Sequence, residues 1–179
     1  MLKGKKVTLR AIEREDVALL AAWAQDHDMW PQVNYRPYEP QTVADALRDF
    51  DAPDSTRWRP RAEGMPFAIV VGEELVGSVA LWGIDQHNRR AHLGISLGPD
   101  FHGKGYGSDA CRVILSYAFV DRGLHRVQLE VLASNEQAIR AYVAAGFVEE
   151  GRTRESAWVT GEMVDEVFMS VLATEWQPT

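Results

Sequence analysis

A glycine-rich turn is the strongest chemical signal in the sequence. In PDFHGKGYGSDA (residues 99–110), Gly103, Gly105 and Gly107 stand at alternate positions between an apolar run and a helical pattern. Glycine destabilises helices and strands, so a cluster of glycines indicates backbone with positive φ or the close approach of a ligand. A turn before a helix N-terminus presents unpaired N–H groups and favours negative charge. The turn is therefore predicted to hold an anion such as pyrophosphate, and a tight turn that binds nothing is the alternative.

The spacing of these glycines excludes three common phosphate-binding loops. A Walker A loop ends in Gly-Lys-Ser/Thr, whereas Lys104 is followed by Gly105. A dinucleotide-binding fingerprint has the spacing G-x-G-x-x-G, whereas these glycines have the spacing G-x-G-x-G. The glycine loop of protein kinases also has the spacing G-x-G-x-x-G, so these glycines do not match it, and the other kinase motifs are missing from the sequence.

The elements that must position this turn are predicted to form a mixed α/β sheet domain. Alternating apolar side chains predict strands, and a period near 3.6 residues predicts helices. The predicted strands span 6–12, 67–71, 75–84, 89–97, 125–132, 148–159 and 163–173, and the predicted helices span 13–26, 42–50, 108–123 and 134–146. The strand–helix–strand unit at 91–132 requires a right-handed crossover between parallel strands, and the other strands are expected to be antiparallel. Residues 51–66, polar and interrupted by prolines, are interpreted as a surface loop.

Capping residues predict where the helices begin and end. Thr42 is a favourable N-cap for the helix at 42–50. Ser134 and Gln137 fit a capping box at the start of the last helix. Gly123 and Gly146 are typical of the position just after a helix C-terminus.

Size and composition are those of an ordinary soluble domain. The 179 residues suffice for one buried core, so a single domain over residues 1–179 is expected. Acidic residues outnumber basic ones by 26 to 19, and the net charge of −7 disfavours nucleic acid while suiting a cationic substrate. The lone Cys111 has no companions for a disulfide or a zinc site and is interpreted as a buried apolar side chain. Without a signal peptide or a membrane-spanning run, a cytoplasmic location away from membranes is expected.

Two central motifs, GISLGPDFHGKGYGSDA and HRVQLEVLASNEQAIRAYVAAGF, closely resemble the GCN5-related N-acetyltransferase (GNAT) superfamily. Within that superfamily, the chain resembles the branch that contains ribosomal-protein N-terminal acetyltransferases and spermidine acetyltransferase. The similarity extends from VTLRAIEREDV near the start to GFVEEGRTRESAWVTGEMVDEVFMSVL near the end. It implies a sheet whose central parallel strands splay apart around acetyl-CoA, in agreement with the predicted order of elements. The activity implied is acetyl transfer from acetyl-CoA to an amine, without a metal.

The resemblance assigns the glycine turn to the diphosphate of CoA. The family pattern Arg/Gln-x-x-Gly-x-Gly falls on residues 102–107, with His102 in place of the usual Arg or Gln. Because backbone amides hold the diphosphate, His102 need not abolish the site. The strand before the turn is expected to pair with the pantetheine arm, and Asn135 matches an asparagine that contacts CoA, although it also suits a helix N-cap. The predicted cofactor-binding residues are Ile95, Ser96, Leu97, His102, Gly103, Lys104, Gly105, Tyr106, Gly107, Ser108 and Asn135.

The resemblance also implies which groups transfer protons. Tyr142 matches the tyrosine that acts as general acid in many members, and it follows Asn135 by about 10 Å along nearly the same helix face. A phenol, with an ordinary pKa of about 10, suits protonation of the departing thiolate. Glu130 matches a glutamate that serves as base in some members, and His92 is the rival base because imidazole titrates at about pH 6.5. A salt-bridge role for Glu130, a structural His92, and a water chain in place of either base all stay open.

The sequence leaves the acceptor amine undecided. Acids near the side expected to receive it suit a polyamine: Glu39, Asp85, Glu162 and Asp165. Against a polyamine, residues 29–40 carry Asn34 and Arg36 where spermidine acetyltransferases have an acid-rich cluster. Tryptophans in or beside predicted loops are candidates for the pocket wall (Trp30, Trp58 and Trp158), whereas Trp23 and Trp82 are expected in the core.

Several functional classes therefore fit the sequence. A protein N-terminus, a small metabolite or an antibiotic would serve as acceptor as well as a polyamine. A CoA-binding module that senses or scaffolds without turnover is the alternative to an enzyme, although retention of Tyr142 favours the enzyme. Homodimers are common among relatives, and no segment of the sequence identifies an interface.

Overall fold

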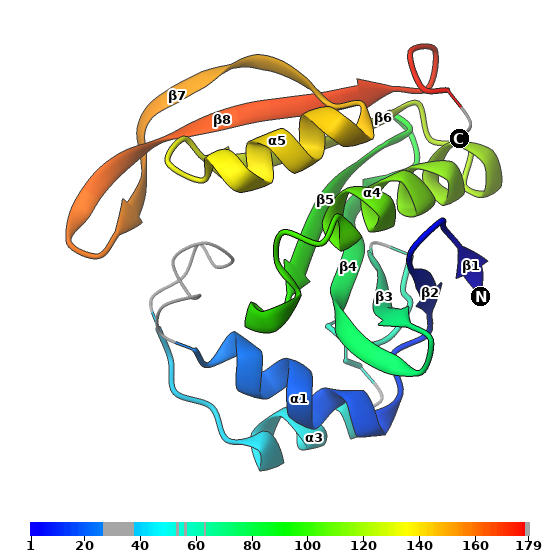
Figure 1. The fold of residues 1–179 in the computed structure, drawn as a ribbon, viewed down its shortest axis with the longest axis vertical. Coiled ribbons are helices and arrows are strands. Elements are labelled where there is room, and N and C mark those ends of the chain that lie inside the picture. Colours follow the sequence, from blue (N-terminus) through cyan, green and yellow to red (C-terminus); the bar gives the residue numbers. More distant parts are fainter. Residues whose placement is uncertain (27–37, 53, 56, 63, 178–179) are drawn as a thin grey trace.

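One eight-stranded sheet with helices on both faces organises the chain in the computed structural model (Figure 1). The structure describes residues 1–26, 38–52, 54–55, 57–62 and 64–177. The strands, in the spatial order β1-β2-β3-β4-β5-β6-β8-β7, are β1 (Leu2–Lys3), β2 (Thr8–Arg10), β3 (Gly64–Val71), β4 (Glu74–Asp85), β5 (Arg90–Leu97), β6 (Arg126–Leu132), β7 (Val148–Val159) and β8 (Glu162–Leu172). The helices are α1 (Arg14–Ala24), α3 (Val43–Asp51), α4 (Tyr106–Ser116) and α5 (Glu136–Ala145), with the 3₁₀ turn η1 (Pro99–Phe101) and the π-helical turn η2 (Tyr117–Asp121). The predicted mixed α/β fold is confirmed.

The central strands β5 and β6 run parallel and then splay apart. Their parallel pairs are Arg90–Arg126, Ala91–Val127 and His92–Gln128. Beyond these pairs, β5 stays paired with β4 up to Leu97, and β6 stays paired with β8 up to Leu132. The inner edges of β5 and β6 therefore face a gap, because each strand is held there only by its outer neighbour. The parallel crossover and the splay are as predicted.

Side chains that alternate along the strands build a separate apolar cluster on each face of the sheet. Ala68 on β3 packs with residues of α1 and α3, whereas the next residue, Ile69, belongs to the main core with residues of α4 and α5. Cys111 on α4 lies in that main core at 1% exposure, and burial raises the pKa of its thiol to about 12. Cys111 is thus the buried apolar side chain that the sequence predicts.

The cap of α3 agrees with the sequence. Thr42 Oγ1 accepts a hydrogen bond from Asp45 N–H at 3.1 Å, and the Asp45 carboxylate accepts one from Thr42 N–H at 3.0 Å. This reciprocal pair satisfies two N–H groups that the first helical turn leaves without partners.

The predicted capping box at the start of α5 is wrong. Asn135, not Ser134, is the N-cap, and its side-chain oxygen accepts from Ala138 N–H at 3.1 Å. A short amide side chain reaches the third N–H of the helix directly, so Gln137 is not needed for capping. Gly146 ends α5 as predicted, with a φ of +105°.

The first strand and the long central helix differ from their predicted spans. The strand predicted at 6–12 pairs only over β2, and β1 was not predicted. The helix predicted at 108–123 is α4 followed by η2, where Arg122 N–H bonds to Tyr117 O at 3.0 Å instead of to the carbonyl four residues back. None of the helices in the described part of the chain combines the length and the apolar character that a membrane span requires.

The segment at 51–66 is more than the predicted surface loop. Asp51 still belongs to α3, and Gly64 already begins β3. Between them, Trp58 is only 4% exposed and packs into the cluster of α1 and α3. An indole contributes so much apolar area that burying it stabilises even an irregular segment. The expectation of a buried Trp82 is also wrong, because 48% of this residue is exposed.

Candidate active site

The glycine turn leads from β5 through η1 into α4 and leaves backbone donors unpaired. Gly105 is the N-cap of α4 and has a φ of +79°, a conformation that L side chains rarely adopt. The first backward hydrogen bond of the helix runs from Asp109 N–H to Gly105 O at 3.2 Å. In the described part of the chain, the N–H groups of Tyr106, Gly107 and Ser108 therefore have no backbone acceptor. Unpaired N–H groups at the positive end of a helix dipole favour an anion, so the geometry of the turn suits the ligand predicted for it.

A lysine from the N-terminal segment adds positive charge beside the turn. Lys6 Nζ donates to Lys104 O at 2.9 Å, and a Cβ atom on Gly105 would lie 2.9 Å from Lys6 Nζ. The buried carboxylate of Asp109 holds this segment in place, since its Oδ2 accepts from the N–H groups of Lys6 at 2.7 Å and Val7 at 3.0 Å. Lys6 and Asp109 are 103 positions apart, so no motif in the sequence pointed to Lys6.

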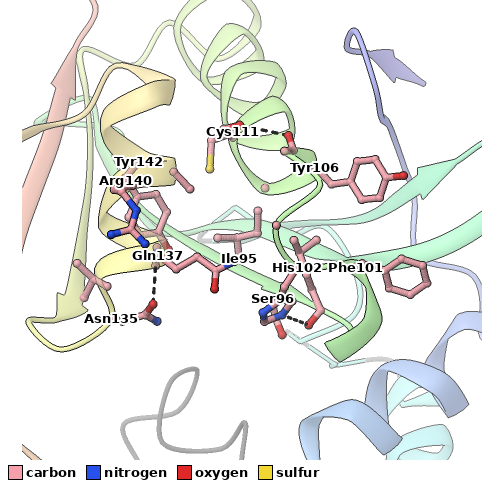
Figure 2. Close-up of a pocket in the computed structure, with 18 of the residues that line it drawn as sticks. Ile95, Ser96, Phe101, His102, Tyr106, Cys111, Asn135, Gln137, Arg140 and Tyr142 are labelled. Atoms are coloured by element: carbon pink, nitrogen blue, oxygen red, sulfur yellow. Dashed lines mark hydrogen bonds between the residues drawn. The ribbon is translucent and has the colours of Figure 1, made fainter.

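A cavity of about 340 Å³ opens from the turn into the gap between the splayed strands (Figure 2). Of the predicted cofactor-binding residues, those that line the cavity are Ile95, Ser96, Leu97, His102, Gly103, Gly105, Tyr106, Gly107, Ser108 and Asn135. Lys104 does not line it, and its Nζ lies 5.4 Å from the centroid of the Phe101 ring. Tyr142 and Glu130 also line the cavity, whereas His92 does not. The structure thus brings one proposed acid and one proposed base to the predicted binding site.

The inner edge of β5 presents backbone groups to this cavity. Gly98 N–H donates to Val76 O of the neighbouring segment at 3.0 Å. Because successive residues of a strand point their amide groups to alternate edges, those of Ile95 and Leu97 face the gap. The ring of His102 donates from Nε2 to Leu97 O at 3.2 Å. His102 therefore ties the turn to the end of β5, a role that the sequence did not reveal.

Both ends of α5 line the same cavity. Asn135 lines it at the start of the helix and Tyr142 near the end, as their seven-residue spacing predicts. Asn135 is the N-cap described above, so that interpretation is confirmed. Tyr142 is 9% exposed, and its ring packs edge-on against Phe147 with 5.7 Å between ring centroids. This packing fixes the phenol at the cavity wall. Two further residues of α5, Gln137 and Arg140, line the cavity without having been predicted.

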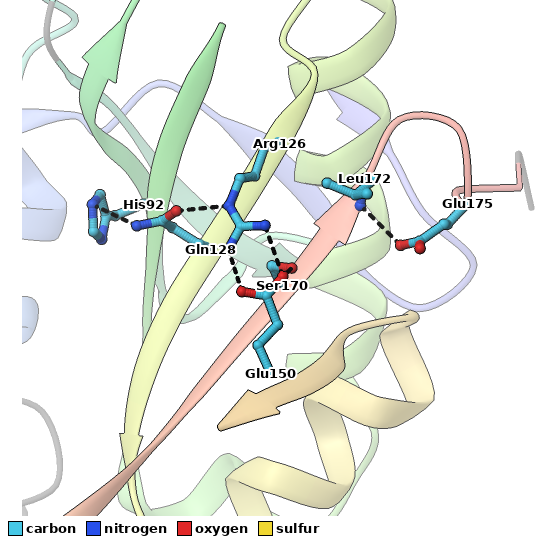
Figure 3. A network of polar contacts seen from close by, with 7 residues as sticks. All are labelled: His92, Arg126, Gln128, Glu150, Ser170, Leu172 and Glu175. Atoms are coloured by element: carbon cyan, nitrogen blue, oxygen red, sulfur yellow. Dashed lines mark hydrogen bonds and ion pairs between the residues drawn. The ribbon is translucent and has the colours of Figure 1, made fainter. Parts of the chain in front are cut away.

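A chain of polar side chains crosses β6 and ends at His92 (Figure 3). Arg126 donates through Nη1 to Glu150 Oε1 at 2.7 Å and through Nη2 to Glu150 Oε2 at 2.5 Å. Arg126 Nε donates to Gln128 Oε1 at 2.9 Å, and Gln128 Nε2 lies 3.1 Å from His92 Nε2. The hydrogen bonds from Arg126 and Ser170 lower the pKa of Glu150 from 4.5 to about 2, so this carboxylate stays charged at neutral pH.

The directions of these hydrogen bonds fix the proton on His92. Arginine has only donors, so the Gln128 oxygen accepts from Arg126 and the Gln128 amide group donates onward. His92 Nε2 is then the acceptor, and the neutral ring carries its proton on Nδ1. His92 Nδ1 lies 3.4 Å from Glu130 Oε2. The half-exposed Trp82 ring stacks on the imidazole, with 4.3 Å between the two ring centroids. The two rival bases are therefore neighbours, although no hydrogen bond joins His92 Nδ1 to the carboxylate.

Other predicted features lie away from the cavity. None of the acids Glu39, Asp85, Glu162 and Asp165 lines it. Trp158 on β7 is 70% exposed and does not line it either. Residues 29–37, with Trp30, Asn34 and Arg36, lie outside the described residues. Within the ranges that the structure covers, no group of three or more His, Cys, Asp or Glu side chains is placed to hold a metal ion.

Comparison with known proteins gives one consistent result. A family model described as an acetyltransferase (GNAT) domain matches residues 6–148. The chain is 31% identical to a putative ribosomal N-acetyltransferase, YdaF, of Bacillus subtilis (strain 168), over 97% of this chain and 95% of that protein. It is 28% identical to the spermidine N(1)-acetyltransferase of Vibrio cholerae, over 97% of this chain and 96% of that one. A crystal structure of the Vibrio cholerae spermidine N-acetyltransferase with CoA and spermine superposes with a TM-score of 0.82 at 27% identity, covering 95% and 97% of the two chains.

Proposed function

The chain belongs to the GNAT acetyltransferase family, and we propose that it passes the acetyl group of acetyl-CoA directly to a primary amine while both substrates are bound. Membership makes it an N-acetyltransferase with acetyl-CoA as the acyl donor. The observation that carries the proposal is the cavity at the splay, where an anion site, an unpaired strand edge, Tyr142 and Glu130 meet. We further propose that residues 1–179 work as one domain, since a single sheet includes strands from both ends of the chain.

The residues of the turn and of β5 fit acetyl-CoA. We assign the diphosphate to the N–H groups of Tyr106, Gly107 and Ser108, with the ammonium of Lys6 close enough to add electrostatic attraction. The amide groups of the pantetheine arm pair with the inner edge of β5 at Ile95 and Leu97. When bound, the donor supplies a thioester whose carbonyl carbon accepts a nucleophile.

Proton transfers at the reacting centre are assigned to Glu130 and Tyr142. The Glu130 carboxylate takes a proton from the acceptor ammonium, so that the amine nitrogen can attack the thioester carbonyl carbon. A C–N bond forms, an N–H group on the inner edge of β5 stabilises the oxyanion, and the C–S bond then breaks. Tyr142 donates its phenolic proton to the departing sulfur, and the proton that the attacking nitrogen loses on becoming an amide restores the phenol through water. His92 carries a proton on the nitrogen that faces Glu130, so we assign it the role of orienting that carboxylate rather than of accepting the proton.

Replacing Glu130 with glutamine is expected to lower kcat/KM about tenfold near neutral pH. The loss should shrink as the pH rises, because the acceptor amine then arrives without its proton and needs no base. The measurement is kcat/KM against pH for a competent amine, with Glu149→Gln as the control because Glu149 pairs with Arg152 on the surface of β7 and neither residue lines the cavity. An unchanged profile in Glu130→Gln, with loss of the acidic limb in His92→Ala instead, would assign the base to His92.

An acetylation assay tests the function itself. The full chain is incubated with acetyl-CoA and, separately, polyamines, peptide N-termini, amino acids and aminated antibiotics, and free thiol is recorded with time. Acceptor-dependent thiol release and an acetylated product are expected for at least one class. Tight CoA binding without turnover on any class would favour the sensor or scaffold.

A further inference from the structure

A second cavity, of about 230 Å³, lies between α1 and the sheet, on the face of β5 away from α4 and α5. It is lined by Ile12, Leu20, Trp23, Ala24, Arg57, Trp58, Pro66, Ser78, Val79, Ala80, Gly94, Ile95 and Ser96. Of these, Ile95 and Ser96 also line the first cavity. The two cavities therefore border the same stretch of β5, beside the splay.

Small residues on two adjacent strands form the floor of this second cavity. The cross-strand pairs Ser78–Ser96 and Ala80–Gly94 lie side by side on β4 and β5. These four positions leave the hollow open because none carries a side chain larger than a hydroxymethyl group. The next pair on the same face is Trp82–His92, and His92 contacts Glu130. The floor thus leads directly toward the proposed base.

The walls of the second cavity are apolar and aromatic. Trp58 is almost fully buried, and Trp23 is half-buried and packs edge-on against Phe101 with 5.9 Å between ring centroids. Ile12 and Leu20 pack in the same cluster on this face of the sheet. Indole rings in such a wall favour a flat apolar group, because stacking adds to the free energy gained by removing apolar area from water.

Arg57 is the only charged side chain among the described residues that line the second cavity. Its guanidinium carbon lies 4.8 Å from the centroid of the Trp58 ring. Arg57 is exposed as a residue, but the atoms that surround its guanidinium partly exclude water and lower its pKa. The negative charge of Asp49 raises the pKa, and this effect is smaller than that of the lost hydration. No carboxylate of the described residues forms an ion pair with Arg57. A cation held in this way attracts an anionic ligand and repels a polycation.

We propose that the second cavity receives the acceptor as a primary amine that carries an aromatic or similarly apolar group and a carboxylate. A free aromatic amino acid and a short peptide of such residues share this chemistry. The apolar group lies between the indole rings, the carboxylate pairs with Arg57, and the amine is directed along the floor toward His92 and Glu130. This inference rests on the proposed function and narrows its substrate class, and it excludes a polyamine as the preferred acceptor.

The test compares acceptors that differ by one feature. Initial rates of acetylation are measured with the full chain, acetyl-CoA and L-phenylalanine, L-alanine, phenylethylamine or spermidine. The dipeptide phenylalanyl-phenylalanine separates the peptide source from the free amino acid. We expect kcat/KM for L-phenylalanine or the dipeptide to exceed each of the others by at least about tenfold.

Two variants test which residues of the second cavity recognise the carboxylate and the aromatic group of the acceptor. Arg57→Gln should reduce the preference for L-phenylalanine over phenylethylamine at least about fivefold, while Arg59→Gln, whose guanidinium lies over Phe50 instead, should leave it unchanged. Gly94→Ala should weaken the preference for an aromatic group because the methyl narrows the floor. The fold accommodates that methyl, since its nearest neighbour would be Trp82 Nε1 at an ordinary 3.6 Å.

A binding measurement separates failure of this inference from failure of the proposed function. Titration of L-phenylalanine and of spermidine into the CoA complex by calorimetry does not depend on turnover. Tighter binding of L-phenylalanine, weakened in Arg57→Gln, supports the acceptor class even if no acetyl group moves, and the absence of turnover then counts against the function alone. Efficient acetylation of spermidine, or equal affinity for both ligands, would overturn the acceptor class and leave the acetyltransferase function standing.

Discussion

Acetyl-CoA binding is expected to weaken by at least about 100-fold when Gly105 is replaced with glutamate. The carboxylate would stand among the N–H groups that we assign to the diphosphate, and two negative groups in one anion site repel each other. The new side chain would also meet Lys6 Nζ, which lies 2.9 Å from the position of a Cβ atom, and would neutralise the positive charge beside the turn. Calorimetric titration with acetyl-CoA measures the loss.

Gly161→Glu is the matched control for this prediction. Gly161 also has positive φ, at +95°, and a Cβ atom there would meet nothing within 4 Å. The hairpin turn between β7 and β8 thus imposes similar backbone strain on a glutamate, and Gly161 does not line the cavity. Both variants should lose thermal stability, and only Gly105→Glu should lose the ligand. Normal affinity in Gly105→Glu would place the diphosphate elsewhere and remove the basis of the site.

Replacing Tyr142 with phenylalanine is expected to lower kcat about 100-fold with little change in the affinity for acetyl-CoA. The variant keeps the ring that packs against Phe147 and removes only the hydroxyl group that we propose protonates the departing sulfur. Without that proton, a thiolate must leave unaided, and general acid catalysis is worth about 10²–10⁴ in rate. A change in kcat without a change in binding is the signature of an interaction made only in the transition state.

Tyr117→Phe provides the control for the loss of a phenol. Tyr117 packs edge-on against Phe67 with 5.3 Å between ring centroids, and it does not line the cavity. Its replacement should leave kcat unchanged. Single-turnover measurements at saturating acetyl-CoA distinguish a slow chemical step from slow product release. A Tyr142→Phe enzyme with normal turnover would assign the proton to another group or to water.

The strands, the helices and the glycine turn could be predicted because their signals are local. Apolar periodicity marked β5, β6 and α5, and three glycines at alternate positions marked the turn before α4. The same local signals failed where tertiary packing decided the outcome. Trp58 lies in a polar, proline-rich segment and is buried, whereas Trp82 lies in an apolar strand and is half exposed. Burial depends on which face of the sheet is covered, and periodicity does not report that.

The sequence by itself determined the family, the glycine turn before α4 and the spacing that places Asn135 and Tyr142 on one cavity, because all of these depend on residues close together along the chain. Only the tertiary structure brought Lys6 to the turn, placed His92 beside Glu130, and set the proton of His92 through Gln128 and Arg126. The second cavity, which is lined by residues from distant segments, was likewise found only in the tertiary structure. These arrangements join segments that are distant in the chain, and their energies depend on distances of a few ångströms that only the folded sheet defines.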